Sequence, residues 1–230
     1  MSKDLTIIKD NLFAKIFVIG FNKTATTSIH NFFRFNGFKS LHSANNWRIE
    51  QFQCFSDNGN LQDFRKLYEE YPESIFILNT RQLDKWIRSR GKHYEYSQWS
   101  RPGRNYPDEK LYRKWIIRRQ KHYKDVLEFF QRDPKRLYII NIDAPNWLDY
   151  MAHIFNLNSI KLHSNRLKDK KIPIDFLNLI DEKFKLACNN LNIKDEDYTS
   201  PLLINSMFKK IKIKNKFLQL LQLYNETTYL

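Results

Sequence analysis

The sequence is poor in glycine and cysteine, and each shortage narrows the kinds of protein that it can encode. Among 230 residues only five are Gly and two are Cys. Few glycines mean few loops that can adopt positive φ angles without cost. Two cysteines, Cys54 and Cys188, provide neither a disulfide framework nor a cysteine-based metal site. That scarcity is typical of a reducing compartment.

Long apolar runs and acidic residues are also scarce. No stretch of about 18 apolar residues occurs, and no cleavable leader is recognisable at the N-terminus, so we expect a soluble, cytoplasmic protein. Lys and Arg number 39 against 25 Asp and Glu, which gives a net charge of +14. This excess predicts anionic partners, but it does not choose among nucleotides, sulfated substrates, nucleic acid and anionic lipid. Hydrophobic residues make up 42%, as in globular proteins.

Apolar strand patterns alternate with amphipathic helix patterns over the first 170 residues. The patterns predict strands at 15–20, 38–42, 74–81 and 137–142, and helices at 24–36, 60–70, 82–90, 108–132 and 145–156. Segment 43–59 is expected to be irregular and 91–107 to be a loop. This order predicts an α/β fold with a central parallel sheet flanked by helices. After about residue 173 only helix patterns remain, so we predict a core at 1–170 and a helical region at 171–230, packed on that core.

The stretch that follows the first strand carries the strongest functional signal. Gly20 ends the strand, and a polar loop with Lys23 and several hydroxyl residues precedes the next helix. Free N–H groups and the helix dipole favour an anion there. The loop is not a Walker A motif, because its Lys precedes the threonines and no second Gly is present. The alternative is an ordinary turn with a Thr or Ser N-cap.

A second signal lies at the end of another expected strand. Arg81 follows Phe76-Ile77-Leu78-Asn79-Thr80, and Ser89 comes eight residues later in the next helix. Arg and Ser can bind one anion together. Ligands of parallel sheets bind at the carboxyl ends of the strands. We therefore expect the loop at 20–28, His42, Arg81 and Asn141 to converge.

These motifs resemble those of sulfotransferases that use 3′-phosphoadenosine 5′-phosphosulfate (PAPS). The order Asn22-Lys23-Thr24-Ala25-Thr26-Thr27-Ser28 is similar to the 5′-phosphosulfate loop of the bacterial-type members, and the spacing from Arg81 to Ser89 is similar to that of their 3′-phosphate site. The resemblance extends over roughly residues 15–168 and includes His163-Ser164-Asn165. One departure is Ala25, where many relatives have Gly. The resemblance implies a P-loop-like fold and an enzyme of the EC 2.8.2 type, with PAP as the product nucleotide and no metal.

The resemblance also assigns residue roles. Lys23 would stabilise the leaving oxygen. The acceptor must also lose a proton, and the candidates for the general base are Asp57, in a segment that resembles the family, and His42, at a predicted strand end near the loop. Alternatively, Asp57 caps the following helix and His42 is structural. The residues expected to bind the nucleotide are Asn22, Lys23, Thr24, Ala25, Thr26, Thr27, Ser28, Arg81, Ser89 and Asn165.

The acceptor is the least determined part of this prediction. Segments 43–56 and 91–107 are the expected acceptor-binding regions, and the aromatic and arginine residues of the second suit a carbohydrate, a small molecule or single-stranded nucleic acid. A basic helix pattern near residues 208–221 suits packing on the chain's own domain, or a homodimer contact. Two other functions stay open: a nucleotide or phosphate-ester kinase, and a nucleic-acid-binding relative without catalysis.

Overall fold

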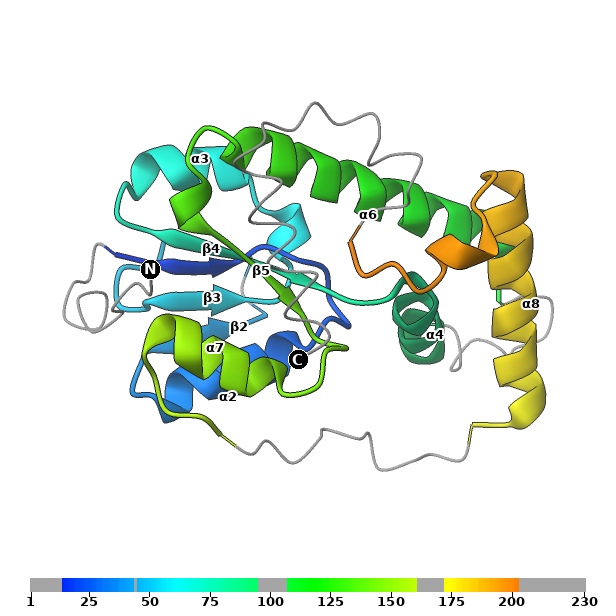
Figure 1. Cartoon of the computed structure of the whole chain (residues 1–230), viewed down its shortest axis with the longest axis horizontal. Coiled ribbons are helices and arrows are strands. Elements are labelled where there is room, and N and C mark those ends of the chain that lie inside the picture. The colour runs from blue at the N-terminus through cyan, green and yellow to red at the C-terminus, as the bar shows by residue number, and fades with distance from the viewer. Residues whose placement is uncertain (1–13, 44, 95–106, 161–171, 203–230) are drawn as a thin grey trace. The chain divides into compact units, whose positions relative to one another are not determined.

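A computed structural model describes residues 14–43, 45–94, 107–160 and 172–202 (Figure 1). They form two compact units. The first contains the described residues up to Thr80 and those of 130–160, and the second contains those of 81–129 and 172–202. The division predicted near residue 170 stays a prediction. Among the described residues, no helix is both long enough and apolar enough to cross a membrane.

The first unit is built on a five-stranded sheet in which every neighbouring pair is parallel. The strand order is β2-β3-β1-β4-β5, so the first strand of the chain lies at the centre. The strands are β1 (Ile16–Val18), β2 (Ser40–His42), β3 (Cys54–Ser56), β4 (Ile75–Thr80) and β5 (Leu137–Asn141). The predicted α/β fold class is therefore confirmed.

The two faces of the sheet have different side chains, because residues alternate along each strand. Ile16 and Val18 point to one face, together with Ile75 and Ile77, and join one buried cluster with side chains of α2 (Thr26–Phe35) and α7 (Trp147–Phe155). Figure 1 shows α2 and α7 against this side of the sheet.

The opposite face is aromatic. The ring of Phe17 lies 5.6 Å from that of Phe55, 5.4 Å from that of Phe76 and 5.9 Å from that of Trp47. Tyr68 of α3 (Phe64–Glu70) adds its ring, 6.3 Å from Phe76. Trp47 is fully buried, so at least this residue of segment 43–56 belongs to the core rather than to an acceptor surface.

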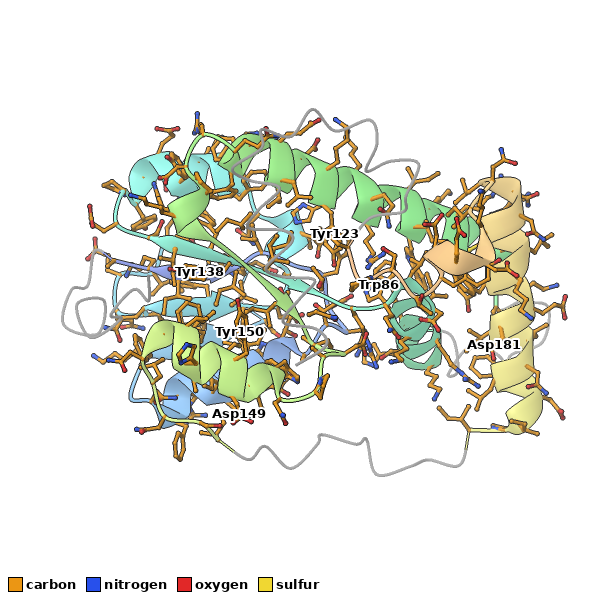
Figure 2. All side chains as sticks on the ribbon, in the orientation of Figure 1. Trp86, Tyr123, Tyr138, Asp149, Tyr150 and Asp181 are labelled. Atoms are coloured by element: carbon orange, nitrogen blue, oxygen red, sulfur yellow. The ribbon has the colours of Figure 1, made fainter. Side chains whose placement is uncertain are left out.

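The second unit is helical and consists of α4 (Leu83–Tyr94), most of α6 (Glu109–Phe130) and α8 (Ile174–Asn190). Arg119 of α6 is buried and donates to the carbonyl oxygens of Arg81, at 2.6 Å, and Pro201, at 2.9 Å. Its guanidinium lies over the rings of Trp86 and Tyr123, both labelled in Figure 2. Three 3₁₀ turns complete the described elements: η1 (Gly59–Leu61), η2 (Pro134–Arg136) and η3 (Asp195–Asp197).

Three local predictions were wrong. Segment 43–59 contains β3, whose two apolar residues are too few for a strand pattern but are held by pairing with β1 and β2. The predicted helix at 60–70 begins only at Phe64, because the Asp63 carboxylate accepts from the N–H groups of Arg65 and Lys66. The helix α4 continues to Tyr94 instead of ending near 90. Residues 95–106 of the predicted loop lie outside the described residues.

Candidate active site

The loop between β1 and α2 starts with a close approach between two strands. The N–H of Gly20 donates to Oδ1 of Asn79 on β4 at 2.9 Å. A Cβ atom at position 20 would lie 2.2 Å from that oxygen and 2.3 Å from the carbonyl oxygen of Asn79. Only Gly leaves room for this contact, which explains why one of the few glycines of the chain lies here.

Asn79 also holds the middle of the loop. Its Nδ2 donates to the carbonyl oxygen of Thr24 at 2.8 Å and to the Thr24 hydroxyl, which itself donates to the carbonyl oxygen of Phe21. The side chains of Asn79 and Thr24 are fully buried. Because its hydroxyl already has both partners, Thr24 would reach a ligand through its backbone. Asn79 is not among the site residues predicted from the sequence, although a polar Asn in an apolar strand signals a buried group that needs hydrogen-bond partners.

Two residues of the loop adopt left-handed backbone angles. Lys23 has φ 64° and Ala25 has φ 59°, and neither is Gly. Such angles cost of order 1 kcal/mol or more each and persist only where the surroundings enforce them. Ala25 is the N-cap of α2 and makes no side-chain hydrogen bond to the helix. The predicted alternative of a Thr or Ser N-cap is therefore wrong.

Asp57 connects the loop with the ends of two strands. It directly follows β3 and has a left-handed φ of 66°. Its carboxylate accepts from the hydroxyl of Ser43, which follows β2, at 2.9 Å and from the hydroxyl of Thr26, in the first turn of α2, at 3.4 Å. Asp57 does not cap the following turn, whose N-cap is Asn58, so the capping alternative is wrong.

His42 lies between the loop and the end of β3. Its Nε2 is 3.1 Å from the hydroxyl oxygen of Thr27, and its Nδ1 is 3.1 Å from that of Ser56. The structure thus brings Thr26, Thr27, His42 and Asp57 together at the carboxyl edge of the sheet.

His30 is a further histidine at this edge and is not among the site residues predicted from the sequence. Its ring stacks on that of His42 with centroids 5.4 Å apart, and its Nδ1 is 2.8 Å from the hydroxyl oxygen of Ser40. Burial, with smaller contributions from the nearby His42 and Arg34, lowers the pKa of His30 to about 4. His30 is therefore neutral at physiological pH.

The depressed pKa of His30 predicts a loss of stability in acid. Below about pH 6.5 His30 is protonated in the unfolded chain, whereas in the folded protein it stays neutral down to about pH 4. The free energy of unfolding therefore decreases as the pH drops from about 6.5 to 4. Allowing for solvent screening of this half-buried ring, we expect a loss of about 1–2 kcal/mol. The variant His30→Asn keeps a hydrogen-bond partner for Ser40. Urea unfolding at several pH values should show that its free energy of unfolding decreases less with falling pH than that of the wild type. The exposed His153 of α7 offers the matched control, and an equal effect of His153→Asn would contradict the assignment.

The other predicted site residues are spread over the two units. Asn22 and Ser28, like the loop around them, belong to the first unit and are half-buried. Arg81 and Ser89 belong to the second unit, Arg81 directly after β4 and Ser89 within α4, so their convergence with the loop stays a prediction. Asn165 lies outside the described residues. Within the described ranges, no three His, Cys, Asp or Glu side chains are grouped so that they could hold a metal ion.

Comparison with known proteins gives one match. Residues 45–136 match the family model described as a sulfotransferase domain. This segment starts after the loop at 20–28 and includes Asp57, Arg81 and Ser89. No curated protein and no solved structure matches the chain significantly. The family match agrees with the parallel α/β sheet, and it shows that the segment 45–136 is similar to a sulfotransferase domain.

Proposed function

We propose that this protein is a sulfotransferase that uses PAPS as donor and sulfates a hydroxyl or amine of a small-molecule or carbohydrate acceptor. The observation that carries the proposal is the loop at 20–28, fixed by Asn79 and strained at Lys23 and Ala25. Strained backbone of this kind is concentrated at ligand-binding sites. An anionic 5′ group suits the loop, because the first N–H groups of α2 have no acceptor from the Ala25 side chain.

The proposed roles follow from the chemistry of each side chain. Lys23 would neutralise the charge that grows on the leaving oxygen, and the loop N–H groups with Thr26, Thr27 and Ser28 would hold the 5′ group. Arg81 and Ser89 would bind the 3′-phosphate, with Asn22 and Asn165 as further nucleotide ligands. When bound, PAPS supplies an already activated sulfuryl group, so none of these roles calls for a metal ion.

In the proposed reaction the acceptor oxygen or nitrogen forms a bond to sulfur as the bond from sulfur to the phosphate oxygen breaks. The acceptor proton moves to a general base, and the electron pair of the broken bond leaves with the nucleotide as PAP. Asp57 suits the base role better than His42. A carboxylate has about four lone-pair sites, of which two accept from Ser43 and Thr26. The two ring nitrogens of His42 both already contact hydroxyl groups.

Removal of the Lys23 charge tests whether the loop is the donor site. We expect Lys23→Ala to weaken PAP binding about tenfold or more, the usual effect of losing a hydrogen bond to a charged group. Titration calorimetry would measure the dissociation constant. Lys66→Ala changes the net charge equally from an exposed position on α3 and should leave it unaltered. Equal weakening by both variants would mean that net charge, and not this loop, attracts the nucleotide.

A further inference from the structure

Three hydroxyl and imidazole groups from different elements form a short chain beside the loop. Thr27 lies in the first turn of α2, His42 ends β2 and Ser56 ends β3. The imidazole of His42 bridges the other two, with both nitrogen–oxygen distances at 3.1 Å. His42 is therefore the group through which the Thr27 hydroxyl is connected to the sheet.

The direction of the hydrogen bonds along this chain is reversible. A neutral imidazole has one N–H donor and one acceptor nitrogen, and a hydroxyl can donate or accept. When Nε2 of His42 is the acceptor, the Thr27 hydroxyl donates its only proton to His42 and has none left to donate to a ligand. When Nε2 carries the proton and donates to Thr27, the hydroxyl proton of Thr27 is available for a ligand.

An anion in the loop would favour the second arrangement, because an anion accepts hydrogen bonds and cannot donate them. The arrangement arises in two ways: with the neutral tautomer that carries its proton on Nε2, or with the imidazolium, which donates from both nitrogens. The imidazolium also attracts the anion by its charge. Both states of His42 thus support binding, and the protonated state supports it more strongly.

We propose that His42 is a positioning residue that donates from Nε2 to Thr27, so that the Thr27 hydroxyl donates to the anionic 5′ group of the nucleotide and binding is accompanied by proton uptake at His42. This inference rests on the proposed function. It assigns His42 a role in donor binding instead of acceptor deprotonation.

The charged and titratable groups around His42 are consistent with this role. From α2, His30 stacks on it and Arg34 lies near His30. His30 stays neutral near physiological pH, so it places no competing charge on the pair. After β3, the Asp57 carboxylate binds Ser43, which follows His42, and Thr26, which precedes Thr27. Lys23 of the loop and Arg81 are the further cations that the proposed function places at the nucleotide.

Two substitutions separate positioning from simple packing. The amide of His42→Gln can donate to Thr27 and does not titrate between about pH 5 and 8, whereas His42→Leu fills space without any donor. PAP affinity would be measured by calorimetry over this range, in two buffers with different ionisation enthalpies. Titration of the PAP phosphates affects all variants equally. The difference in pH dependence of PAP affinity between a His42 variant and the wild type therefore reports the contribution of His42.

We expect wild-type affinity to rise about fivefold as the pH falls through this range, as a neutral hydrogen bond becomes a charged one. His42→Gln should keep most of the affinity and lose this additional rise together with its share of proton uptake. His42→Leu should bind PAP about tenfold more weakly than the wild type near neutral pH, and the difference should grow in acid because this variant also lacks the additional rise. His30→Asn should behave like wild type, because the pKa of His30 lies below the range.

Equal weakening in His42→Gln and His42→Leu, with the wild-type pH dependence retained in both, would overturn the inference. Should His42→Leu fail to fold, histidine NMR signals provide the second measurement. The signal that is missing from His42→Gln should move to a higher pKa when PAP binds the wild type, and an unmoved signal would also overturn the inference. Absence of PAP binding to the wild type would instead remove the proposed function itself.

Discussion

Exchange of Asp57 for Asn is expected to lower kcat about 10²- to 10⁴-fold, the range that a general base contributes. Asn has the same shape and keeps one oxygen that can accept from Ser43 or Thr26, so the loop should keep its conformation and its affinity for PAP. The loss would therefore appear in turnover and not in nucleotide binding. Release of PAP from PAPS in the presence of an accepted substrate would measure turnover, and calorimetry would measure binding.

His42→Gln is the matched variant for this experiment. It changes the other candidate base at the same edge of the sheet, and we expect it to retain turnover near neutral pH. The opposite pattern, with kcat lost in His42→Gln and kept in Asp57→Asn, would make His42 the base. That result would contradict both the role of Asp57 and the positioning role of His42.

Replacement of Gly20 by Ala is expected to destabilise the first unit by about 3 kcal/mol or more. The new Cβ would lie 2.2 Å from Oδ1 of Asn79 and 2.3 Å from its carbonyl oxygen, far inside van der Waals contact. Relief of the clash requires β1 and β4 to separate or Asn79 to turn away. Either movement breaks buried hydrogen bonds to Gly20 and Thr24. Urea unfolding followed by circular dichroism would measure the change.

Gly91→Ala provides the control for this prediction. Gly91 lies inside α4, and an added Cβ would meet only side-chain ends, the Tyr112 hydroxyl at 2.8 Å and Cδ1 of Ile180 at 3.2 Å. Ala also has a helix propensity about 1 kcal/mol better than Gly, which offsets the crowding. We expect a net change within about 1 kcal/mol. A Gly20→Ala protein as stable as Gly91→Ala would show that the contact with Asn79 does not constrain the loop.

The sequence predicted the elements with long, continuous apolar patterns. The strands β1, β4 and β5 lie where Ile, Phe and Val runs placed them, and Gly37, with φ 84°, follows α2 where its end was expected. β3 escaped prediction because its short Cys-Phe-Ser segment is a strand only through its neighbours. The helix predicted at 82–90 continues through Gly91 to Tyr94, and at Gly91 an added Cβ would lie 2.8 Å from the Tyr112 hydroxyl.

The candidate site likewise has parts that could be predicted from the sequence and parts that could not. The loop at 20–28 and its proximity to His42 could be predicted, because strand, loop and helix are local features and parallel strands end at one edge. The contacts of Asn79, His30 and Ser56 could not be predicted, because each depends on a partner that is distant in the chain.

The measurement that tests the central claim most directly is the thermal stabilisation of the protein by PAP. At 100 times the dissociation constant, PAP should add about 2.7 kcal/mol to the stability of the wild type. The variant Arg81→Ala should lose most of this added stability, because the Arg81 side chain is expected to bind the 3′-phosphate of the nucleotide. Adenosine 5′-monophosphate, which lacks that phosphate, should stabilise both proteins equally. A wild type that gains no stability at millimolar PAP would contradict the assignment of the loop as a PAPS site.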